Sequence, residues 1–309
     1  MKNILNTFVL IAALAVVSLA QTAQEHFARG NQFYKTKQYA SAIASFNEAI
    51  RLMPSSHSAW FNRAQAYYYS GNLDAAINDY SQVIRLAPAH RDAYFQRGLA
   101  YNKKGSHDLA IADYSKGLQL APNDPQFYYN RGIAFADKGV LESALSDYNQ
   151  AIRINPSYTK AFLNRGAVYY KQKQYDLALA DTNIALKLDP NYAEAWGNRG
   201  VLYNAKNQPD LAIPDLTQAL KVDPNYEKAY LDRGISYTKK RQYSLAIADL
   251  NQAIKLNPKY MGAYLMRGAI YFDTKRYDLA KADMTKVLEL SPNQKLATDL
   301  LSRISKLAP

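Results

Sequence analysis

Residues 159–192 read TKAFLNRGAVYYKQKQYDLALADTNIALKLDPNY, and this 34-residue unit is one of eight similar copies in the 309-residue chain. The copies are not identical, but each has a proline at the same place. These prolines are Pro54, Pro88, Pro122, Pro156, Pro190, Pro224, Pro258 and Pro292. A fixed period of this size predicts a stack of similar supersecondary units rather than a single globular core.

Certain positions of the unit keep the same kind of residue throughout. We number them from 1 to 34, so that the repeats are 23–56, 57–90, 91–124, 125–158, 159–192, 193–226, 227–260 and 261–294. Position 8 is glycine or alanine and position 20 is alanine in every copy, position 11 is always aromatic, and position 4 is aromatic in all but the first. Positions 4, 8 and 11 share one helical face. The small residues at positions 8 and 20 therefore predict two closely packed helices in each repeat.

The ends of these two helices are marked by turn residues. A polar break near positions 14–17, which contains Gly71, Gly105 and Gly139, separates the helices. The proline at position 32 cannot continue the second helix and therefore ends it. Pro214 is an exception, because it lies inside the second helix of the sixth repeat, where we expect a lost backbone hydrogen bond and a kink.

The pattern over residues 23–294 resembles the tetratricopeptide repeat family. This resemblance implies an all-α, right-handed superhelical solenoid of antiparallel helix pairs with a concave inner face. One helix pair cannot bury its apolar side alone, and stacking supplies the missing core. Residues 295–309 carry leucines and isoleucine at helical spacing. We expect them to form a C-terminal capping helix.

The N-terminal segment differs from the repeats. Lys2 precedes an uncharged apolar run from residue 8 to residue 20, and Ser18 and Ala20 have the spacing that a signal peptidase reads. The run is shorter than the roughly 20 apolar residues of a membrane span. We therefore predict a signal peptide over residues 1–20, and a periplasmic or secreted protein that does not span the membrane after cleavage. An uncleaved anchor is the alternative.

Composition narrows the classes of function. The chain has no cysteine, so disulfides and thiol chemistry are excluded. Its net charge of +12 is spread over the chain rather than gathered in one stripe, which argues against nucleic acid as a partner. We find no phosphate loop, no GxGxxG, GxSxG or HExxH motif, and no histidine pair at metal-binding spacing. The prediction is a protein that is not an enzyme and binds no cofactor or metal.

Two charged columns depart from the family pattern. Position 7 is arginine in every repeat, and position 23 is aspartate in all but the first, which has Ser45. The paired departures predict an Arg–Asp ladder between neighbouring helices, partly buried and mutually satisfied. The alternative is two independent solvated columns of charge. In either case we assign these residues to structure and not to a ligand site.

The family resemblance implies that a ligand lies against positions 2, 5, 6, 9, 12 and 13 of the first helices. These positions are rich in aromatic residues in the first five repeats, and position 6 holds a row of carboxamides, each able to pair with a peptide bond. The same residues are also common in the family as scaffold. The candidate site residues are Phe27, Asn31, Tyr34, Phe61, Asn62, Gln65, Tyr68, Tyr69, Phe95, Gln96, Tyr129, Asn130, Asn164, Tyr170 and Asn198.

These features predict an exported scaffold that holds an extended protein segment in its groove, as part of an envelope or secretion assembly. The carboxylate clamp of chaperone-binding family members is absent, because Phe27, Asp92 and Gln96 stand at the positions where the clamp has lysine or arginine. Two alternatives remain open. Aromatic rings and carboxamides also suit glycans, and the uncapped first repeat suits a homo-oligomer that assembles end to end.

Overall fold

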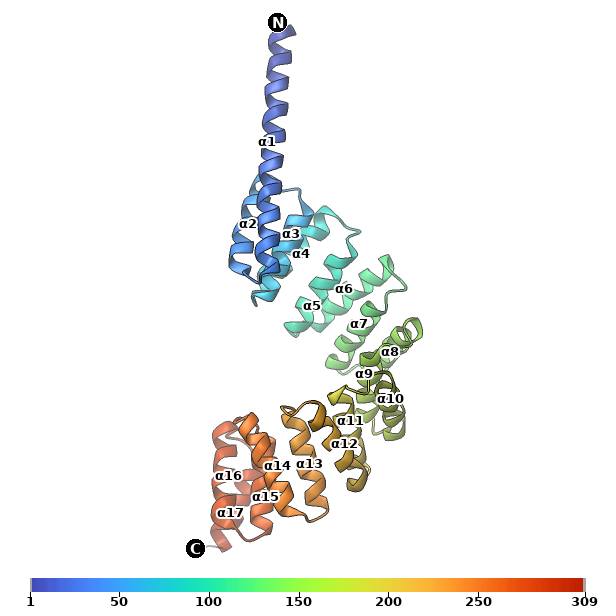
Figure 1. The fold of residues 1–309 in the computed structure, drawn as a ribbon, viewed down its shortest axis with the longest axis vertical. Coiled ribbons are helices and arrows are strands. Elements are labelled where there is room, and N and C mark those ends of the chain that lie inside the picture. The colour runs from blue at the N-terminus through green and yellow to red at the C-terminus, as the bar shows by residue number, and fades with distance from the viewer. Residues whose placement is uncertain (1, 308–309) are drawn as a thin grey trace. The chain divides into compact units, whose positions relative to one another are not determined.

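The protein is entirely helical in the part that the computed structural model describes, which is residues 2–307 for the backbone and residues 18–307 for the side chains (Figure 1). The helices are α1 (Lys2–Lys35), α2 (Tyr39–Leu52), α3 (His57–Tyr69), α4 (Leu73–Leu86), α5 (Arg91–Lys103), α6 (His107–Leu120), α7 (Pro125–Lys138), α8 (Leu141–Ile154), α9 (Thr159–Lys171), α10 (Tyr175–Leu188), α11 (Ala193–Ala205), α12 (Pro209–Val222), α13 (Glu227–Lys239), α14 (Tyr243–Leu256), α15 (Met261–Asp273), α16 (Tyr277–Leu290) and α17 (Lys295–Leu307). Each repeat thus contributes one helix pair, as the sequence predicts.

The chain forms two compact units, Met1–Pro156 and Ser157–Pro309. Within the first unit each helix packs against the next from α1 to α7, α7 packs against α8, and the first helices α1, α3, α5 and α7 also touch in succession. Within the second unit the helices from α9 to α17 pack in the same serial way, and α11, α13 and α15 touch in succession. Within each unit, the first helices of successive repeats therefore share a common face, which we call the first-helix face of that unit.

The last residue of each repeat precedes the first helix of the next, and several of these residues cap that helix. The Ser56 hydroxyl, the His90 ring and the Asp124 carboxylate each accept a hydrogen bond from a backbone amide in the first turn that follows. Such bonds satisfy amides that have no partner within the helix. These caps fix where α3, α5 and α7 begin.

The turn inside each repeat depends on one backbone conformation at position 15. The residue there has a positive φ in every repeat, between 57° and 87°. It is glycine in repeats two to four, but elsewhere it is Lys37, Lys173, Asn207, Arg241 or Lys275. Residues with a Cβ adopt this conformation at a cost. The turn geometry is therefore retained even in repeats that lack the favourable residue.

The core within a repeat forms where position 8 meets position 24. A Cβ built on Gly98 would lie 2.7 Å from the Tyr114 ring, and one on Gly132 would lie 2.8 Å from the Tyr148 ring. The expected approach to position 20 is also present, since Gly234 lies against the backbone carbonyl of Ala246. The small residue at position 8 thus allows the backbone at position 20 to approach and leaves room for the large side chain at position 24. The contact with position 24 was not predicted.

Where the third and fourth repeats meet, one residue is larger and its partner is smaller than in the other repeats. Position 3 is alanine in most repeats but is Phe127 in the fourth, where its ring is 1% exposed. Position 27 is alanine or valine elsewhere but is Gly117 in the third, and a Cβ there would lie 1.9 Å from the Phe127 ring. Gly117 therefore provides the room that Phe127 occupies.

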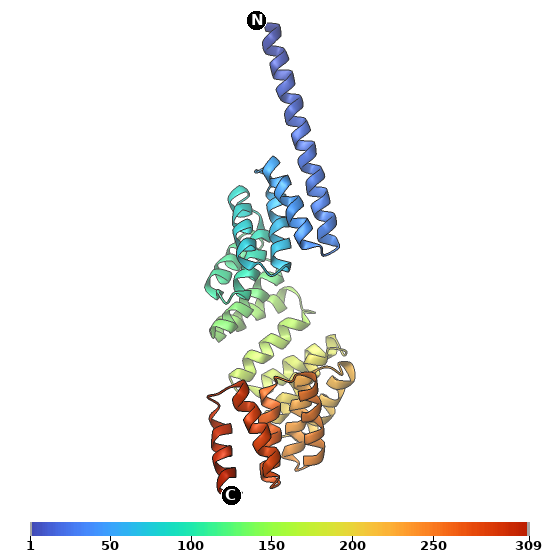
Figure 2. The same cartoon turned by 90° about the vertical axis from the view of Figure 1, so that its left-hand side faces the viewer.

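The two ends of the chain differ. α17 packs against α16 and buries Ala297, Leu300 and Ile304, as expected of a capping helix, although residues 308–309 lie outside the described part. At the other end α1 continues beyond the pair that it forms with α2, and neither view shows another described helix beside its first half (Figures 1 and 2). The predicted signal peptide lies almost wholly outside the residues whose side chains are described.

Pro214 does not end its helix. α12 runs unbroken from Pro209 to Val222, with Pro214 exposed inside it. Proline cannot donate a backbone hydrogen bond, so the bond to the carbonyl one turn earlier is missing at this point. The kink expected here stays a prediction.

Candidate functional site

The charges that recur at positions 7 and 23 form the predicted ladder. In each pair the arginine Nε and Nη2 donate to the two aspartate oxygens at 2.6–2.9 Å, and the aspartates are only 3–7% exposed. The pairs are Arg63–Asp79, Arg97–Asp113, Arg131–Asp147, Arg165–Asp181, Arg199–Asp215, Arg233–Asp249 and Arg267–Asp283. This bidentate geometry is the strongest form of the interaction. The alternative of two solvated columns is wrong.

The arginines also connect neighbouring repeats. Arg97 Nη1 donates to Ser81 Oγ of the preceding repeat at 2.9 Å, and Arg63 makes the equivalent bond to Asn47 at 2.7 Å. Aromatic rings at positions 4 and 11 flank most of these guanidinium groups, as when Arg63 lies 4.6 Å from the Trp60 ring centroid and 5.8 Å from the Tyr67 ring centroid. Hydrogen bonding to Asp147 raises the pKa of Arg131 further above its ordinary value. These charges serve the scaffold and are unavailable to a ligand.

The candidate ligand residues all lie on first helices, where they are half-buried or exposed. In the first unit α1 carries Phe27, Asn31 and Tyr34, α3 carries Phe61, Asn62, Gln65, Tyr68 and Tyr69, α5 carries Phe95 and Gln96, and α7 carries Tyr129 and Asn130. In the second unit α9 carries Asn164 and Tyr170, and α11 carries Asn198. The contacts between successive first helices therefore bring the residues of the first unit together on one face.

The aromatic residues at position 5 are partly occupied by packing. The Phe61 ring lies 5.6 Å from the Tyr80 ring of its own repeat, and Phe95 lies 6.0 Å from Tyr114. Phe61 also stacks on His90 at 5.0 Å. These rings cover the core and remain half-buried on the first helices, so they form an apolar floor of the first-helix face.

Four tyrosines form a cluster at the start of the first unit. Tyr39 and Tyr69 stack at 6.0 Å with an angle of 17°, and Tyr34 lies 5.9 and 6.1 Å from these two rings. Tyr68 meets Tyr69 edge-on at 5.4 Å. Burial and the neighbouring hydroxyls raise the pKa of Tyr34 to about 12. We call Tyr34, Tyr39, Tyr68 and Tyr69 the tyrosine cluster.

Tyr39 was missed by sequence reasoning. It occupies position 17, at the start of the second helix, where four of the eight repeats have tyrosine. Its position gives no sign that its ring stacks on Tyr69 from the next repeat. The Tyr69 side chain remains 58% exposed, so the cluster presents this ring to solvent.

The carboxamides of the first unit differ in how free they are. Asn62 donates to Asn31 Oδ1 at 2.7 Å, and Asn130 donates to the Gln126 carbonyl of its own helix at 2.8 Å. Gln65 and Gln96 have no hydrogen-bond partner within residues 18–307. The row is therefore present, but Gln96 has more unused donors and acceptors than Asn130.

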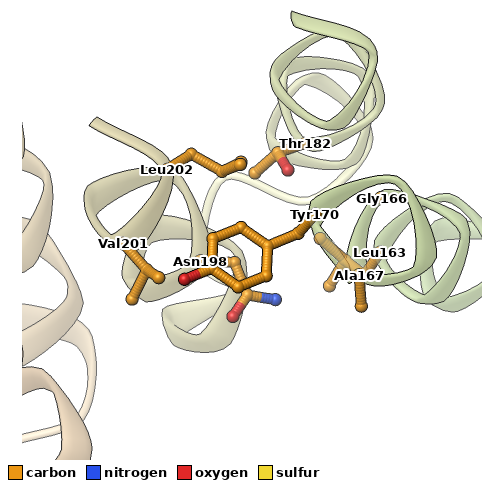
Figure 3. Close-up of a pocket in the computed structure, with 8 residues that line it drawn as sticks. All are labelled: Leu163, Gly166, Ala167, Tyr170, Thr182, Asn198, Val201 and Leu202. Atoms are coloured by element: carbon orange, nitrogen blue, oxygen red, sulfur yellow. The ribbon is translucent and has the colours of Figure 1, made fainter. Parts of the chain in front are cut away.

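The second unit contains a cavity that opens at its first-helix face. Figure 3 shows Tyr170 reaching from α9 toward Asn198 and Val201 of α11, with Thr182 of α10 and Leu202 nearby. The cavity has a volume of about 190 Å³. Two predicted residues, Tyr170 and Asn198, thus line one site.

A hydrogen-bonded group in the second unit, formed by Asn204, Asp232 and Ser236, was not predicted from the sequence. The buried Ser236 hydroxyl donates to Asn204 Oδ1 at 2.9 Å, and Asn204 donates to the Asp232 carbonyl at 3.0 Å. Burial raises the pKa of the Asp232 carboxyl to about 7, while Lys228 partly offsets this shift. These bonds join α11 to α13, so we assign the group to the contact between repeats.

Residues 18–307 contain no group of three or more metal-ligating His, Asp or Glu side chains. Among the described helices, none has both the length and the apolar character needed to cross a bilayer.

Comparison with solved structures shows the fold. A chain of the Cut9–Hcn1 hetero-tetramer of the APC/C matches at a TM-score of 0.67 and 20% identity over 86% of this chain, which spans 52% of that chain. A tetratricopeptide repeat protein from Parabacteroides merdae matches at 0.66 and 20% over 81% of this chain and 99% of its own. Pseudomonas aeruginosa pilF matches at a TM-score of 0.61 and 20% identity, over 69% of this chain and 97% of its own. No curated protein matches the chain.

Family models match most of the repeats directly. Tetratricopeptide repeat models match residues 62–125, 159–192, 193–226, 227–260 and 262–294, and a further TPR model matches 30–69 and 134–173. Three of these ranges coincide with the fifth, sixth and seventh repeats. The chain belongs to the tetratricopeptide repeat family.

Proposed function

We propose that this protein is a non-catalytic scaffold that holds an extended protein segment against its first-helix face. The first unit supplies the principal surface. The observation that carries the proposal is the combination on α3 and α5 of an apolar floor, Phe61 and Phe95, with the unpaired carboxamides of Gln65 and Gln96. Such a surface satisfies both the side chains and the backbone of a bound strand.

The charged ladder supports this assignment indirectly. Because Arg63 and Arg97 are held by buried aspartates, they cannot serve as the cations that recognise a carboxylate or phosphate ligand. Binding therefore depends on apolar contact and on uncharged hydrogen bonds. Each such bond contributes about 1 kcal/mol net, so affinity requires several of them together with buried rings.

We further propose that the scaffold is exported and works in an envelope or secretion assembly. The support is the apolar run up to Ala20, with small residues at the spacing of a cleavage site. N-terminal sequencing of protein from the periplasm or medium tests this step. A chain that starts at Gln21 is the expected result, and an exported chain that still carries Lys2 contradicts cleavage.

Site-specific cross-linking tests the binding face, and the lack of cysteine makes it direct. Gln96→Cys places one thiol on the first-helix face, and Lys116→Cys places one on the exposed side of α6 as a matched control. Each variant is labelled with a benzophenone maleimide and irradiated in envelope extract. We expect residue 96 to form adducts with defined segments of a few proteins, and residue 116 to form none of them.

Other outcomes have definite meanings. Identical adducts from both positions contradict a binding face on the first helices. The exposed, stacked Tyr69 ring gives a specific reason to consider glycans, since flat aromatic surfaces suit sugar rings. Loss of the residue 96 adducts in the presence of soluble cell-wall fragments would favour a glycan-binding module. A size that falls on dilution would favour self-assembly instead.

A further inference from the structure

One repeat lacks the side chain that fills the core of the others. Position 24 is large in seven repeats, which have Phe46, Tyr80, Tyr114, Tyr148, Leu216, Leu250 and Met284. The fifth repeat has Thr182 there, opposite Gly166 at position 8. Small residues thus face each other in this repeat only, and the volume of a large side chain is missing.

The structure does not close the gap that this leaves. A Cβ built on Gly98 or Gly132 would lie within 3.0 Å of the facing ring, whereas the nearest side-chain atoms to one on Gly166 are Asp181 Cβ at 3.5 Å and Thr182 Oγ1 at 3.7 Å. The resulting cavity of about 190 Å³ is lined by Leu163, Gly166, Tyr170, Thr182, Asn198 and Leu202 (Figure 3). It is open to the first-helix face rather than sealed inside the repeat.

The walls of the cavity accept an apolar group. The Thr182 hydroxyl donates to the Ala178 carbonyl at 2.8 Å, so it has no unsatisfied proton facing the cavity. Leu163 and Leu202 are only 5% and 3% exposed and supply apolar walls. An engineered apolar cavity of about 150 Å³ in another protein binds benzene, so this volume suits a leucine or phenylalanine side chain.

A hydrogen-bonding group stands beside the apolar cavity. Asn198 occupies position 6, the carboxamide column, and has no hydrogen-bond partner within residues 18–307. A free hydrocarbon does not use such a group, but a peptide does, because each side chain is flanked by a donor and an acceptor. The pairing of an apolar cavity with a free carboxamide therefore favours a peptide as the occupant.

We propose that this cavity binds one leucine or phenylalanine side chain of the extended protein segment, while Asn198 hydrogen-bonds the adjoining peptide bond. This inference rests on the proposed function and adds to it a specificity: the segment carries a bulky apolar residue where it passes α9 and α11. Glycine and alanine at that place leave the cavity empty and bind more weakly.

Defined probes test the site without knowledge of the natural partner. The full chain, methyl-labelled at leucine and valine, is titrated with N-acetyl-leucine N-methylamide, with the alanine analogue and with toluene. We expect saturable shifts of the Leu163, Val201 and Leu202 methyls, with the leucine probe binding at least about tenfold more tightly than the alanine probe. Asn198→Ala weakens the leucine probe severalfold and leaves toluene unchanged.

Two variants at one position control for folding. Thr182→Tyr fills the cavity with the residue that repeats two to four carry there, so we expect a folded protein that does not bind the leucine probe. Thr182→Val keeps the volume and retains binding. Equal affinity for the leucine and alanine probes, persistence of binding in Thr182→Tyr, or indifference to Asn198→Ala overturns the proposal, as does the absence of saturable shifts.

The two tests can fail separately. Cross-linking from residue 96 does not involve the cavity, and the probe titration does not require the natural partner. Loss of probe binding with intact cross-linking removes the cavity from the binding site but leaves the scaffold. Probe binding without any protein adduct from residue 96 contradicts the proposed scaffold function. It also overturns the proposed role of the cavity in partner recognition, although the cavity itself would still bind small apolar groups.

Discussion

Arg97 donates two hydrogen bonds to Asp113, from Nε to Oδ2 at 2.8 Å and from Nη2 to Oδ1 at 2.7 Å. A third bond from the same guanidinium reaches Ser81 of the preceding repeat. The aspartate is 5% exposed, so its charge has been removed from water and is balanced by this one partner. A buried pair of this kind is costly to break on one side only.

Asp113→Ala is therefore expected to lower the free energy of unfolding by about 3–5 kcal/mol, because it leaves the Arg97 charge partly buried without a partner. Asp108→Ala is the matched control in the same helix, since Asp108 pairs with Lys138 at the surface with 77% of its side chain exposed. That pair contributes about 1 kcal/mol or less. Urea unfolding followed by circular dichroism, with amide exchange of α5 and α6, measures both. Equal effects of the two substitutions contradict the buried ladder.

Gly117 and Phe127 are expected to be strongly coupled. Phe127→Ala alone costs about 3–5 kcal/mol through the cavity that it leaves. Gly117→Ala alone costs about 1–3 kcal/mol through overpacking against the ring. The double variant restores the small pair common in the other repeats, so its loss of stability should be well below the sum. A double-mutant cycle on urea unfolding measures the coupling, and simple additivity would show that the two residues do not share this space.

Lys173 provides a test of the turn within the repeat. Its φ of 59° is favourable for glycine and costly for lysine. Lys173→Gly is expected to stabilise the protein by about 0.5–1 kcal/mol, after the greater freedom of glycine in the unfolded chain is counted. Lys187→Gly, in the last turn of α10, is the control and should destabilise the protein, because it replaces a good helix former that also lies favourably near the helix C-terminus. Thermal unfolding compares them, and a loss of stability in both variants contradicts the turn geometry.

Asp232 predicts a pH dependence in the second unit. Burial raises the pKa of its carboxyl to about 7, whereas the unfolded value is about 3.9. The folded state therefore binds the proton more tightly, and its contribution to stability is complete below pH 4 and lost as the pH rises to about 7. The difference in unfolding free energy between the parent and Asp232→Asn should change over this interval and level off above it. A constant difference from pH 4 to pH 8 contradicts the shift.

The repeat itself could be predicted almost completely from the sequence, because each structural role returns at a fixed position. The proline at position 32 ends the second helix because it cannot donate a backbone hydrogen bond. Arginine at position 7 and aspartate at position 23 both depart from the family pattern, which indicates that residues such as Arg97 and Asp113 are in contact. The Arg–Asp contact recurs in seven repeats, so the sequence shows the same pairing seven times.

The features that occur once were harder to predict. Thr182 departs from its column in the sequence, but its consequence depends on position 24 facing position 8, which the pattern alone did not show. Tyr39 lies in a column rich in tyrosine, and only the fold shows that its ring stacks on Tyr69. The Asp232 carboxyl is perturbed by how completely its surroundings exclude water, and no spacing in the chain reports that quantity.

Within each unit, the bonds from arginines to the preceding repeat have a consequence for how such a chain can change in length. The acceptors, among them Asn47, Ser81, Ser115, Asn183, Thr217 and Asn251, differ in type but each offers a side-chain oxygen at the same position. A duplication or deletion of one whole repeat would therefore keep this arginine bond, whereas contacts that occur once, such as Gly117–Phe127 and Ser236–Asn204, would be disrupted if the new junction fell on them. Unequal recombination elsewhere could lengthen or shorten this protein in steps of 34 residues without a compensating substitution at the arginine bond.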